Sequence, residues 1–209
     1  WLDSERYEKD KNKLKELKDL DGVIVPGGFG KRGTEGMILA ANFARENKIP
    51  YFGLCLGVQI MTIAYARHVL GLKNANSSEL DPETPDPVIT TMVDQVEKIK
   101  NKNYGASMRL GAYPCILKSG SVAGRAYGKK NISERHRHRY EINNAYVEPL
   151  QKAGLVFSGI SPDGKLMEIA ELSSKDHPFY LGTQFHPEFT GRPLSPHPLF
   201  TAFIKACAK

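Results

Sequence analysis

The sequence predicts an α/β fold in which a mostly parallel central sheet is flanked by helices, with a smaller region of antiparallel strands. Short apolar runs bounded by glycine and proline alternate with helical patterns over the first 70 residues, which is typical of βαβ units. The second half contains four further apolar runs of strand length. The 209 residues are enough for one substantial core, so we expect a single domain over residues 1–209.

The elements of the first third follow from hydrophobic periodicity. Charged residues with leucines at helical spacing predict an amphipathic helix over residues 4–19. A buried strand is expected over residues 22–26, followed by a glycine-rich loop. A helix over residues 34–47, a strand over 49–54 and a helix over 57–70 come next. These alternations favour parallel strands joined by helical crossovers.

The remainder is less regular at first and then rich in strands. Residues 74–107 are polar and contain three prolines, so we expect a long excursion with little regular structure beyond a strand at residues 88–92. Further strands are expected over residues 113–118, 155–160, 166–172 and 179–185, and a closing helix over about residues 198–208.

Composition excludes several classes of function. The sequence has no run of about 18 apolar residues and its N-terminus lacks the apolar stretch of a signal peptide, so we expect no membrane association and a cytoplasmic location. Three cysteines are too few for a disulfide framework and fit a reducing compartment. The net charge is +6, but the lysines are scattered and accompany no nucleic-acid-binding module. A solvated surface is therefore the better interpretation, and no nucleic-acid partner is expected.

Cys55 differs from the other thiols because it lies in the run Gly53-Leu54-Cys55-Leu56-Gly57 at a strand-to-helix junction. This pattern is the thiol form of the nucleophile elbow, where small residues two places away avoid clashes in a sharp turn. The following helix would favour a thiolate at its N-terminus and present the amide of Leu56 to an oxyanion. A buried structural cysteine at a tight turn is the alternative. Cys115 and Cys207 are expected to be structural.

His186 and Glu188 are the expected partners of Cys55. His186 ends a predicted strand, and Glu188 follows two residues later. Residues two apart in an extended chain point to the same side, so the carboxylate can hold the far nitrogen of the imidazole. The residue types then match a nucleophile, its base and the group that orients the base. In the glycine-rich loop, Gly28 is our candidate for a second oxyanion amide.

The remaining histidines predict no metal site. His136 and His138 fall in a basic run, but no cysteine or carboxylate cluster accompanies them at the spacing of metal ligands. His68, His177 and His197 are expected to have surface or packing roles. We therefore expect neither a metal nor another cofactor in this domain.

Six segments add to this constellation: Val25-Pro-Gly-Gly-Phe-Gly-Lys-Arg-Gly33, Gly53-Leu-Cys-Leu-Gly-Val-Gln59, Asn74-Ala-Asn-Ser-Ser-Glu79, Met108-Arg-Leu-Gly111, Glu134-Arg-His-Arg-His-Arg-Tyr-Glu141 and Gln184-Phe-His-Pro-Glu188. Together they resemble the class I (triad) glutamine amidotransferase family, and specifically the glutaminase domains of the CTP synthase family. The first, second and last segments mark the broad class, and the other three are more particular to CTP synthases. Residues 104–107 depart from a more glycine-rich stretch of that family.

The resemblance implies a flavodoxin-like amidotransferase fold and a role for each residue of the constellation. Cys55 would be the nucleophile, His186 the general acid and base, and Glu188 its orienter. The amides of Gly28 and Leu56 would form the oxyanion hole. The residues implied to bind glutamine are Gly28, Leu56, Gln59, Glu79, Arg139 and Tyr140.

The implied activity is the hydrolysis of L-glutamine to glutamate and ammonia through a γ-glutamyl thioester. In the family, the ammonia passes to an N-terminal synthetase domain, which uses ATP and Mg to aminate UTP to CTP, and GTP stimulates the coupling. The resemblance also implies a homo-oligomer, a tetramer by family, when the protein is full length. The chain is then expected to be a fragment that lacks its first strand and the synthetase domain.

Two alternatives stay open at this stage. A free-standing γ-glutamyl hydrolase or another amidotransferase subunit would carry the same triad, although the segment over residues 134–141 argues against it. A catalytically inactive binding module would use the fold for assembly alone. The intact Cys55, His186 and Glu188 oppose that interpretation.

Overall fold

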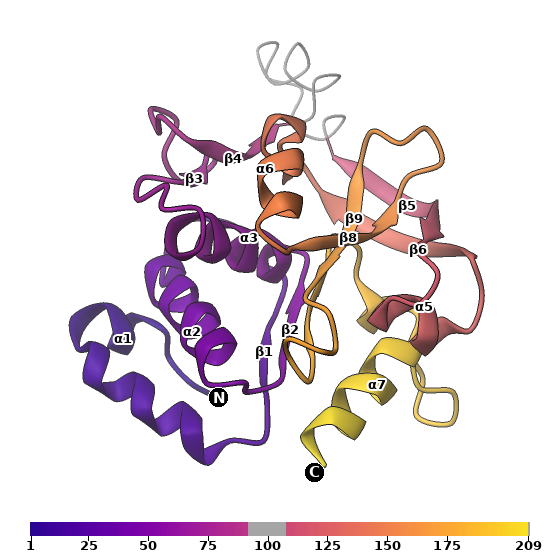
Figure 1. Ribbon diagram of the computed structural model, residues 1–209, viewed down its shortest axis with the longest axis horizontal. Coiled ribbons are helices and arrows are strands. Elements are labelled where there is room, and N and C mark those ends of the chain that lie inside the picture. The colour runs from indigo at the N-terminus through magenta and orange to yellow at the C-terminus, as the bar shows by residue number, and fades with distance from the viewer. Residues whose placement is uncertain (92–107, 209) are drawn as a thin grey trace.

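The computed structural model describes residues 1–91 and 108–208, and its centre is a seven-stranded sheet with the strand order β1-β2-β10-β9-β8-β5-β6 (Figure 1). The strands of this sheet are β1 (Val23–Val25), β2 (Tyr51–Leu54), β5 (Arg109–Leu117), β6 (Asn131–His138), β8 (Val156–Ile160), β9 (Met167–Glu171) and β10 (Tyr180–Thr183). A second sheet consists of β3 (Asn76–Ser77), β4 (Pro87–Thr91) and β7 (Tyr140–Ile142). The expected strand at residues 88–92 corresponds to β4, and its last residue lies outside the described residues, as do residues 104–107.

Helices cover both faces of the large sheet (Figure 1). The α-helices are α1 (Glu5–Lys9), α2 (Thr34–Glu46), α3 (Leu56–His68), α5 (Val122–Tyr127), α6 (Val147–Lys152) and α7 (Pro198–Cys207), and the 3-10 helices are η1 (Lys11–Asp19), η3 (Asn144–Tyr146) and η4 (Pro187–Phe189). No helix in the described ranges has the length and apolar character needed to cross a membrane.

The predicted α/β class is confirmed, but the large sheet is mixed rather than mostly parallel. Its strands β1, β2 and β10 pair in parallel. The pairings of β10 with β9, β9 with β8, β8 with β5, and β5 with β6 are antiparallel. Short connections such as the turn at residues 161–166 between β8 and β9 explain this, because a parallel pair needs a long crossover.

The single helix expected over residues 4–19 is divided into α1 and η1. Asp10 interrupts it with extended backbone angles, φ −148° and ψ 101°, and its carboxylate accepts a hydrogen bond from the amide of Asn12 at 2.9 Å. Aspartate competes for backbone donors in this way, which favours a new helix start. Two of the leucines predicted to face the core nevertheless do so, since Leu14 and Leu17 are buried.

Strand β6 was not predicted, and the residues that face inward explain why. Its side chains alternate between exposed and buried, with Ile132, Glu134, His136 and His138 on the buried side. Only one of these four is apolar, so the alternation of apolar and polar residues that predicts a half-buried strand is missing. The partner strand β5 likewise begins at Arg109, before the apolar run from which a strand at residues 113–118 was expected.

Two apolar clusters form the core on the two faces of the large sheet. One packs α2 and α3 against the sheet, and α3 is buried on all sides because α2 and the small sheet also cover it. The other joins α5 and α7 to the sheet through aromatic contacts, in which the ring of Phe179 lies 5.7 Å from that of Phe52 and 5.5 Å from that of Phe203. The three parallel strands are thereby covered by helices on both faces.

Glu171 attaches α5 to the sheet and gives a test of the fold. Its buried carboxylate accepts hydrogen bonds from the amides of Val122 at 2.6 Å and Ala123 at 3.0 Å, and from the hydroxyl of Ser158 at 2.8 Å. We expect Glu171→Ala to lower the free energy of unfolding by about 2–4 kcal/mol, because it leaves buried donors without an acceptor. Urea denaturation of the full-length protein measures the change.

The matched control is Glu148→Ala, which removes an exposed carboxylate whose partner is Lys152, four residues later in the same helix. We expect it to change the free energy of unfolding by less than about 0.5 kcal/mol. Equal effects of the two substitutions would contradict the role assigned to Glu171.

Candidate active site

Cys55 lies between β2 and α3 in a backbone conformation that residues with side chains rarely adopt, with φ 51° and ψ −96°. A Cβ atom at Gly53 would lie 2.5 Å from the main chain of Gly57, and one at Gly57 would lie 2.3 Å from the carbonyl oxygen of Val25. Only glycine fits at either position. The structure thus has the sharp strand-to-helix turn of a nucleophile elbow.

The thiol of Cys55 is buried among groups from two other strands. Its main-chain amide donates to the carbonyl oxygen of Thr183 at 2.7 Å, which ties the turn to β10. The sulfur lies 3.7 Å from Nε2 of Gln184, which donates to it, and 3.9 Å from the carbonyl oxygen of Arg137 on β6. Cys55 is therefore held by the parallel half of the sheet and faces the antiparallel half.

His186 follows β10 and has one fixed nitrogen and one buried, unpaired nitrogen. Its Nδ1 lies 2.6 Å from Oε1 of Glu188, and its Nε2 has no hydrogen-bond partner among the described residues. A Cβ atom at Gly27 would lie 2.8 Å from Cε1 of His186 and 3.5 Å from Cβ of Cys55. The imidazole and the Cβ atom of Cys55 therefore pack against the same glycine. Phe189 stacks on the imidazole with ring centroids 4.5 Å apart.

The charge state of His186 suits a proton donor. Burial alone would lower the pKa of this imidazole, but the interactions with Cys55 and Glu188 outweigh burial and raise the pKa to about 9. Glu188 thus orients the ring and also favours its protonated form. At neutral pH the imidazolium can give a proton to a leaving group.

The two residues predicted to supply oxyanion donors, Gly28 and Leu56, lie in contact with each other. Leu56 is the first residue of α3, so its amide belongs to the first turn, where N–H groups lack an acceptor within the helix. A Cβ atom at Gly28 would lie 3.2 Å from Cδ2 of Leu56, which places the glycine loop against the start of α3. Main-chain amides at these positions can stabilise negative charge on an oxygen bound at Cys55.

The residues predicted to bind glutamine fall into two groups around Cys55. In the first, Nε2 of Gln59 donates to the carbonyl oxygen of Tyr140 at 2.9 Å and lies 3.3 Å from Oε1 of Gln184. These contacts connect α3 with the start of β7.

In the second group, the carboxylate of Glu79 accepts a hydrogen bond from the amide of Gly30 at 3.4 Å. Burial raises the pKa of Glu79, while the amide of Gly30 and the charge of Arg139 act in the opposite direction. Glu79 therefore lies near the glycine loop on one side and near Arg139 on the other.

Gln184 and Gly27 were not among the predicted site residues, although Gln184 donates to the sulfur of Cys55 and Gly27 packs against both Cys55 and His186. A usable signal existed for Gln184, because it precedes His186 by two residues and residues two apart on a strand share a side. Gly27 offered no such signal, since glycine loops have many roles. Among the described residues, no group of three or more His, Cys, Asp or Glu is arranged to hold a metal ion.

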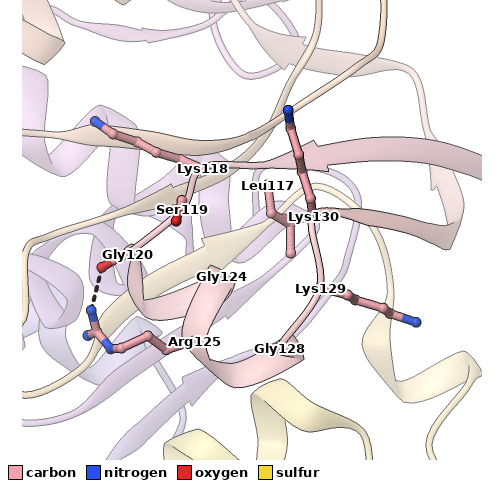
Figure 2. Close-up of a pocket in the computed structure, with 9 residues that line it drawn as sticks. All are labelled: Leu117, Lys118, Ser119, Gly120, Gly124, Arg125, Gly128, Lys129 and Lys130. Carbon is pink, nitrogen blue, oxygen red and sulfur yellow. Dashed lines mark hydrogen bonds between the residues drawn. The ribbon is translucent and has the colours of Figure 1, made fainter.

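A separate basic pocket of about 510 Å³ lies where β5 meets α5. It is lined by Leu117, Lys118, Ser119, Gly120, Gly124, Arg125, Gly128, Lys129 and Lys130 (Figure 2). The lysines point in different directions, and Arg125 donates to the carbonyl oxygen of Gly120 (Figure 2). The pocket shares no residue with the site around Cys55.

Comparison with known proteins places this geometry in a family. The family model described as glutamine amidotransferase class-I matches residues 2–206. The chain is 56% identical over 207 residues to a CTP synthase of Rubrobacter xylanophilus, which covers 99% of this chain and 36% of that relative. The chain thus spans little more than a third of the length of this curated relative.

Solved structures agree with that assignment. The glutaminase domain of Trypanosoma brucei CTPS, solved with bound acivicin, matches with a TM-score of 0.92 and 39% identity, covering 100% of this chain and 79% of that one. A putative GMP synthase component from Thermoplasma acidophilum matches with a TM-score of 0.60 and 18% identity, covering 93% and 76%, and shares the fold alone. The chain therefore belongs to the class I glutamine amidotransferase family, as a glutaminase domain of the CTP synthase type.

Proposed function

We propose that Cys55, His186 and Glu188 are the catalytic triad with which this domain hydrolyses L-glutamine to glutamate and ammonia. The observation that carries the proposal is the packing of the Cys55 side chain and the His186 imidazole against Gly27, with the carboxylate of Glu188 2.6 Å from the far nitrogen of the ring. Nucleophile, base and orienter thus stand in the order that nucleophilic catalysis requires.

In the first half of the reaction, the Cys55 thiolate attacks the side-chain carbonyl carbon of glutamine and a C–S bond forms. The carbonyl electron pair moves to oxygen, and this oxyanion accepts hydrogen bonds from the amides of Gly28 and Leu56. When the oxyanion collapses, the C–N bond breaks and Nε2 of His186 gives its proton to the departing nitrogen. Ammonia leaves, and a γ-glutamyl thioester remains on Cys55.

In the second half, water attacks the thioester carbonyl and Nε2 of His186 accepts a proton from it. The same two amides hold the second oxyanion. Its collapse breaks the C–S bond and returns the Cys55 thiolate beside a protonated His186, and the released γ-carboxylic acid gives its proton to solvent to become glutamate.

Glutamine itself needs groups of both charges, because its α-ammonium and α-carboxylate both enter the site. We assign the ammonium to Glu79, whose carboxylate lies beside the glycine loop. The α-carboxylate is assigned to main-chain amides around Arg139 and Tyr140. Gln59 shapes the pocket between them through its hydrogen bond to the carbonyl oxygen of Tyr140.

The proposal extends to the longer protein. By analogy with the CTP synthases that it matches, we infer that the ammonia passes to an N-terminal synthetase domain, which uses ATP and Mg to aminate UTP, with GTP as an activator and a tetrameric assembly. A cytoplasmic location stays a prediction. We also propose a further strand beside β1, because β1 is an edge of the large sheet and Ile24 on it is 43% exposed.

Selective alkylation tests the nucleophile. The glutamine analogue 6-diazo-5-oxo-norleucine should add to Cys55, because the analogue carries the groups that the site recognises. Cys115 should stay unmodified, since it is 1% exposed and burial raises its pKa to about 12. Peptide mass spectrometry locates the adduct, and Cys55→Ser is the control that should abolish it. An adduct on Cys115 or Cys207 in place of Cys55 would defeat the assignment.

Separation of the two activities tests the role of Cys55 in the full-length protein. Cys55→Ala should lower glutamine-dependent CTP formation by about 10³-fold or more, because no thioester can form. Formation of CTP from added ammonia should be unchanged. Cys115→Ala is the matched control and should retain both activities. Loss of both activities in Cys55→Ala would mean that this cysteine supports the fold.

The pH dependence tests the pair of His186 and Glu188. Since the pKa of His186 is raised to about 9, kcat/KM for glutamine should fall on the alkaline side near that pH, as the imidazolium loses its proton. Glu188→Gln removes a charge that raises this pKa, so the alkaline limb should move to lower pH and kcat should fall. Initial rates between about pH 6 and pH 10 measure both effects. An alkaline limb that stays in place would contradict the assigned contact.

A further inference from the structure

A chain of buried polar groups leads from the interior of the large sheet to the wall of the Cys55 site. Nδ1 of His138 lies 3.1 Å from the carbonyl oxygen of Tyr140, and Nε2 of His138 lies 3.0 Å from Nδ1 of His136. Beyond them, Nε2 of His136 lies 3.7 Å from Oε2 of Glu168 on β9. The three side chains are at most 2% exposed. The proposed mechanism uses none of them.

The short contacts assign the protons on both imidazoles. The carbonyl oxygen of Tyr140 can only accept, so Nδ1 of His138 must carry a hydrogen. Burial and the nearby charge of Arg109 lower the pKa of His138 to about 3 and that of His136 to about 2, so both rings are neutral. Nε2 of His138 is then an acceptor, and Nδ1 of His136 must carry the hydrogen that joins the rings.

The opposite arrangement, with both hydrogens on Nε2, is unfavourable. It would set the lone pair of Nδ1 of His138 against the carbonyl oxygen of Tyr140 at 3.1 Å. The guanidinium of Arg109, which only donates, lies 3.5 Å from Nδ1 of His136 and on its own would favour an acceptor there. The two shorter contacts, at 3.0 and 3.1 Å, outweigh this long one.

This assignment leaves one gap in the chain. Nε2 of His136 and Oε2 of Glu168 are both buried, and neither has a hydrogen-bond partner among the described residues. Each presents a lone pair to the other across 3.7 Å. A proton on Glu168, with a shift that brings the two atoms within hydrogen-bond distance, would convert the contact into an O–H···N hydrogen bond. Burial raises the pKa of Glu168 to about 7, although Arg109 donates to its Oε1 at 2.7 Å and acts against the increase.

The other charged or titratable groups that act on this pair come from three elements. Arg109 and Cys115 belong to β5, and Asp163 belongs to the turn between β8 and β9. His186, from the end of β10, acts on the imidazoles of His136 and His138. Among these groups, Arg109 is the one that hydrogen-bonds to Glu168.

The chain continues from Tyr140 to the nucleophile. The same carbonyl oxygen of Tyr140 accepts from Nε2 of Gln59 at 2.9 Å. Gln59 contacts Oε1 of Gln184 at 3.3 Å, and Nε2 of Gln184 lies 3.7 Å from the sulfur of Cys55. Each side-chain amide in this series is oriented by the acceptor before it. A displaced Tyr140 carbonyl would therefore release Gln59 and then Gln184.

We propose that Glu168, His136 and His138 are positioning residues for the glutaminase reaction. They hold the carbonyl oxygen of Tyr140 and, through Gln59 and Gln184, the sulfur of Cys55, and one exchangeable proton between Glu168 and His136 completes the chain. The positioning role rests on the proposed function, whereas the arrangement of protons does not. The two parts are therefore tested by separate measurements.

The first measurement is independent of activity. Solid-state ¹⁵N NMR of the full-length protein with labelled histidine should show both rings neutral, with the hydrogen on Nδ1. His136→Gln and His138→Gln assign the signals, since each removes one set. Hydrogens on Nε2, or an imidazolium at either position at neutral pH, would overturn the proton chain.

The second measurement compares two substitutions at Glu168. Glu168→Gln keeps an acceptor for Arg109 and supplies an N–H donor to His136, so kcat for glutamine should stay within about threefold of the original value. Glu168→Leu removes both, and kcat should fall by at least about tenfold with a smaller change in KM, because the nucleophile loses its orientation. A component of the pH dependence of kcat near pH 7 should disappear in Glu168→Gln.

Controls separate positioning from folding. Ammonia-dependent CTP formation should be unchanged in each variant. The kcat of each variant is divided by the fraction of its Cys55 that the glutamine analogue can label, so that inactive molecules are not counted. His138→Phe gives a second test if Glu168→Leu does not fold, and it should show the same loss in kcat. His177→Gln is the matched control. His177 is also buried, at 1% exposed, but it contacts the carbonyl oxygen of Ala44 and is not part of the series of groups that leads from Glu168 to Cys55.

Unchanged kcat in both Glu168→Leu and His138→Phe would overturn the positioning role. A different outcome is that the unsubstituted protein hydrolyses no glutamine and yet carries a hydrogen on Nδ1 of both rings. That result would refute the proposed function, and with it the positioning role. It would leave the arrangement of protons on Glu168, His136 and His138 unaffected.

Discussion

The close approach of α3 to β1 is the constraint on which the site depends. The first turn of α3 passes so near β1 that a single methyl group on Gly57 would collide with the carbonyl oxygen of Val25. At this close approach the backbone of Cys55 has a positive φ of 51°, a conformation that costs about 1–3 kcal/mol and persists only where packing imposes it. The burial of α3 on all sides supplies that packing.

The parallel half of the sheet brings the groups of the site together beside this turn. Strands that run in the same direction end at the same edge, and chemistry in α/β proteins collects there. The glycine loop follows β1, Cys55 follows β2, and His186 follows β10, so three neighbouring strands deliver three different groups to one place. The antiparallel half then closes the site from the other side, because β6 brings the carbonyl oxygen of Arg137 to within 3.9 Å of the sulfur of Cys55.

How well the sequence predicted each helix and strand depended on the kind of side chain that the element buries. The strands and helices up to His68 bury apolar side chains, so periodicity located them within a few residues. Strand β6 buries the polar residues Glu134, His136 and His138, so a pattern of apolar residues cannot predict it. In the site, Cys55, His186 and Glu188 were predicted because local spacing encodes their geometry. Gln184 and Gly27 act through contacts between distant segments, and spacing along the chain does not encode those.

The histidines around Cys55 show that neighbouring groups decide which imidazole is protonated. His186 interacts with Cys55 and has Glu188 at 2.6 Å, and its pKa is raised to about 9 despite burial. For His136, burial and the charge of Arg109 lower the pKa to about 2. One wall of the site thus carries a proton that can be transferred, and the other presents only neutral rings. In the proposed mechanism, this difference would confine proton transfer to the reacting atoms, because neutral rings of low pKa do not compete for the proton of His186.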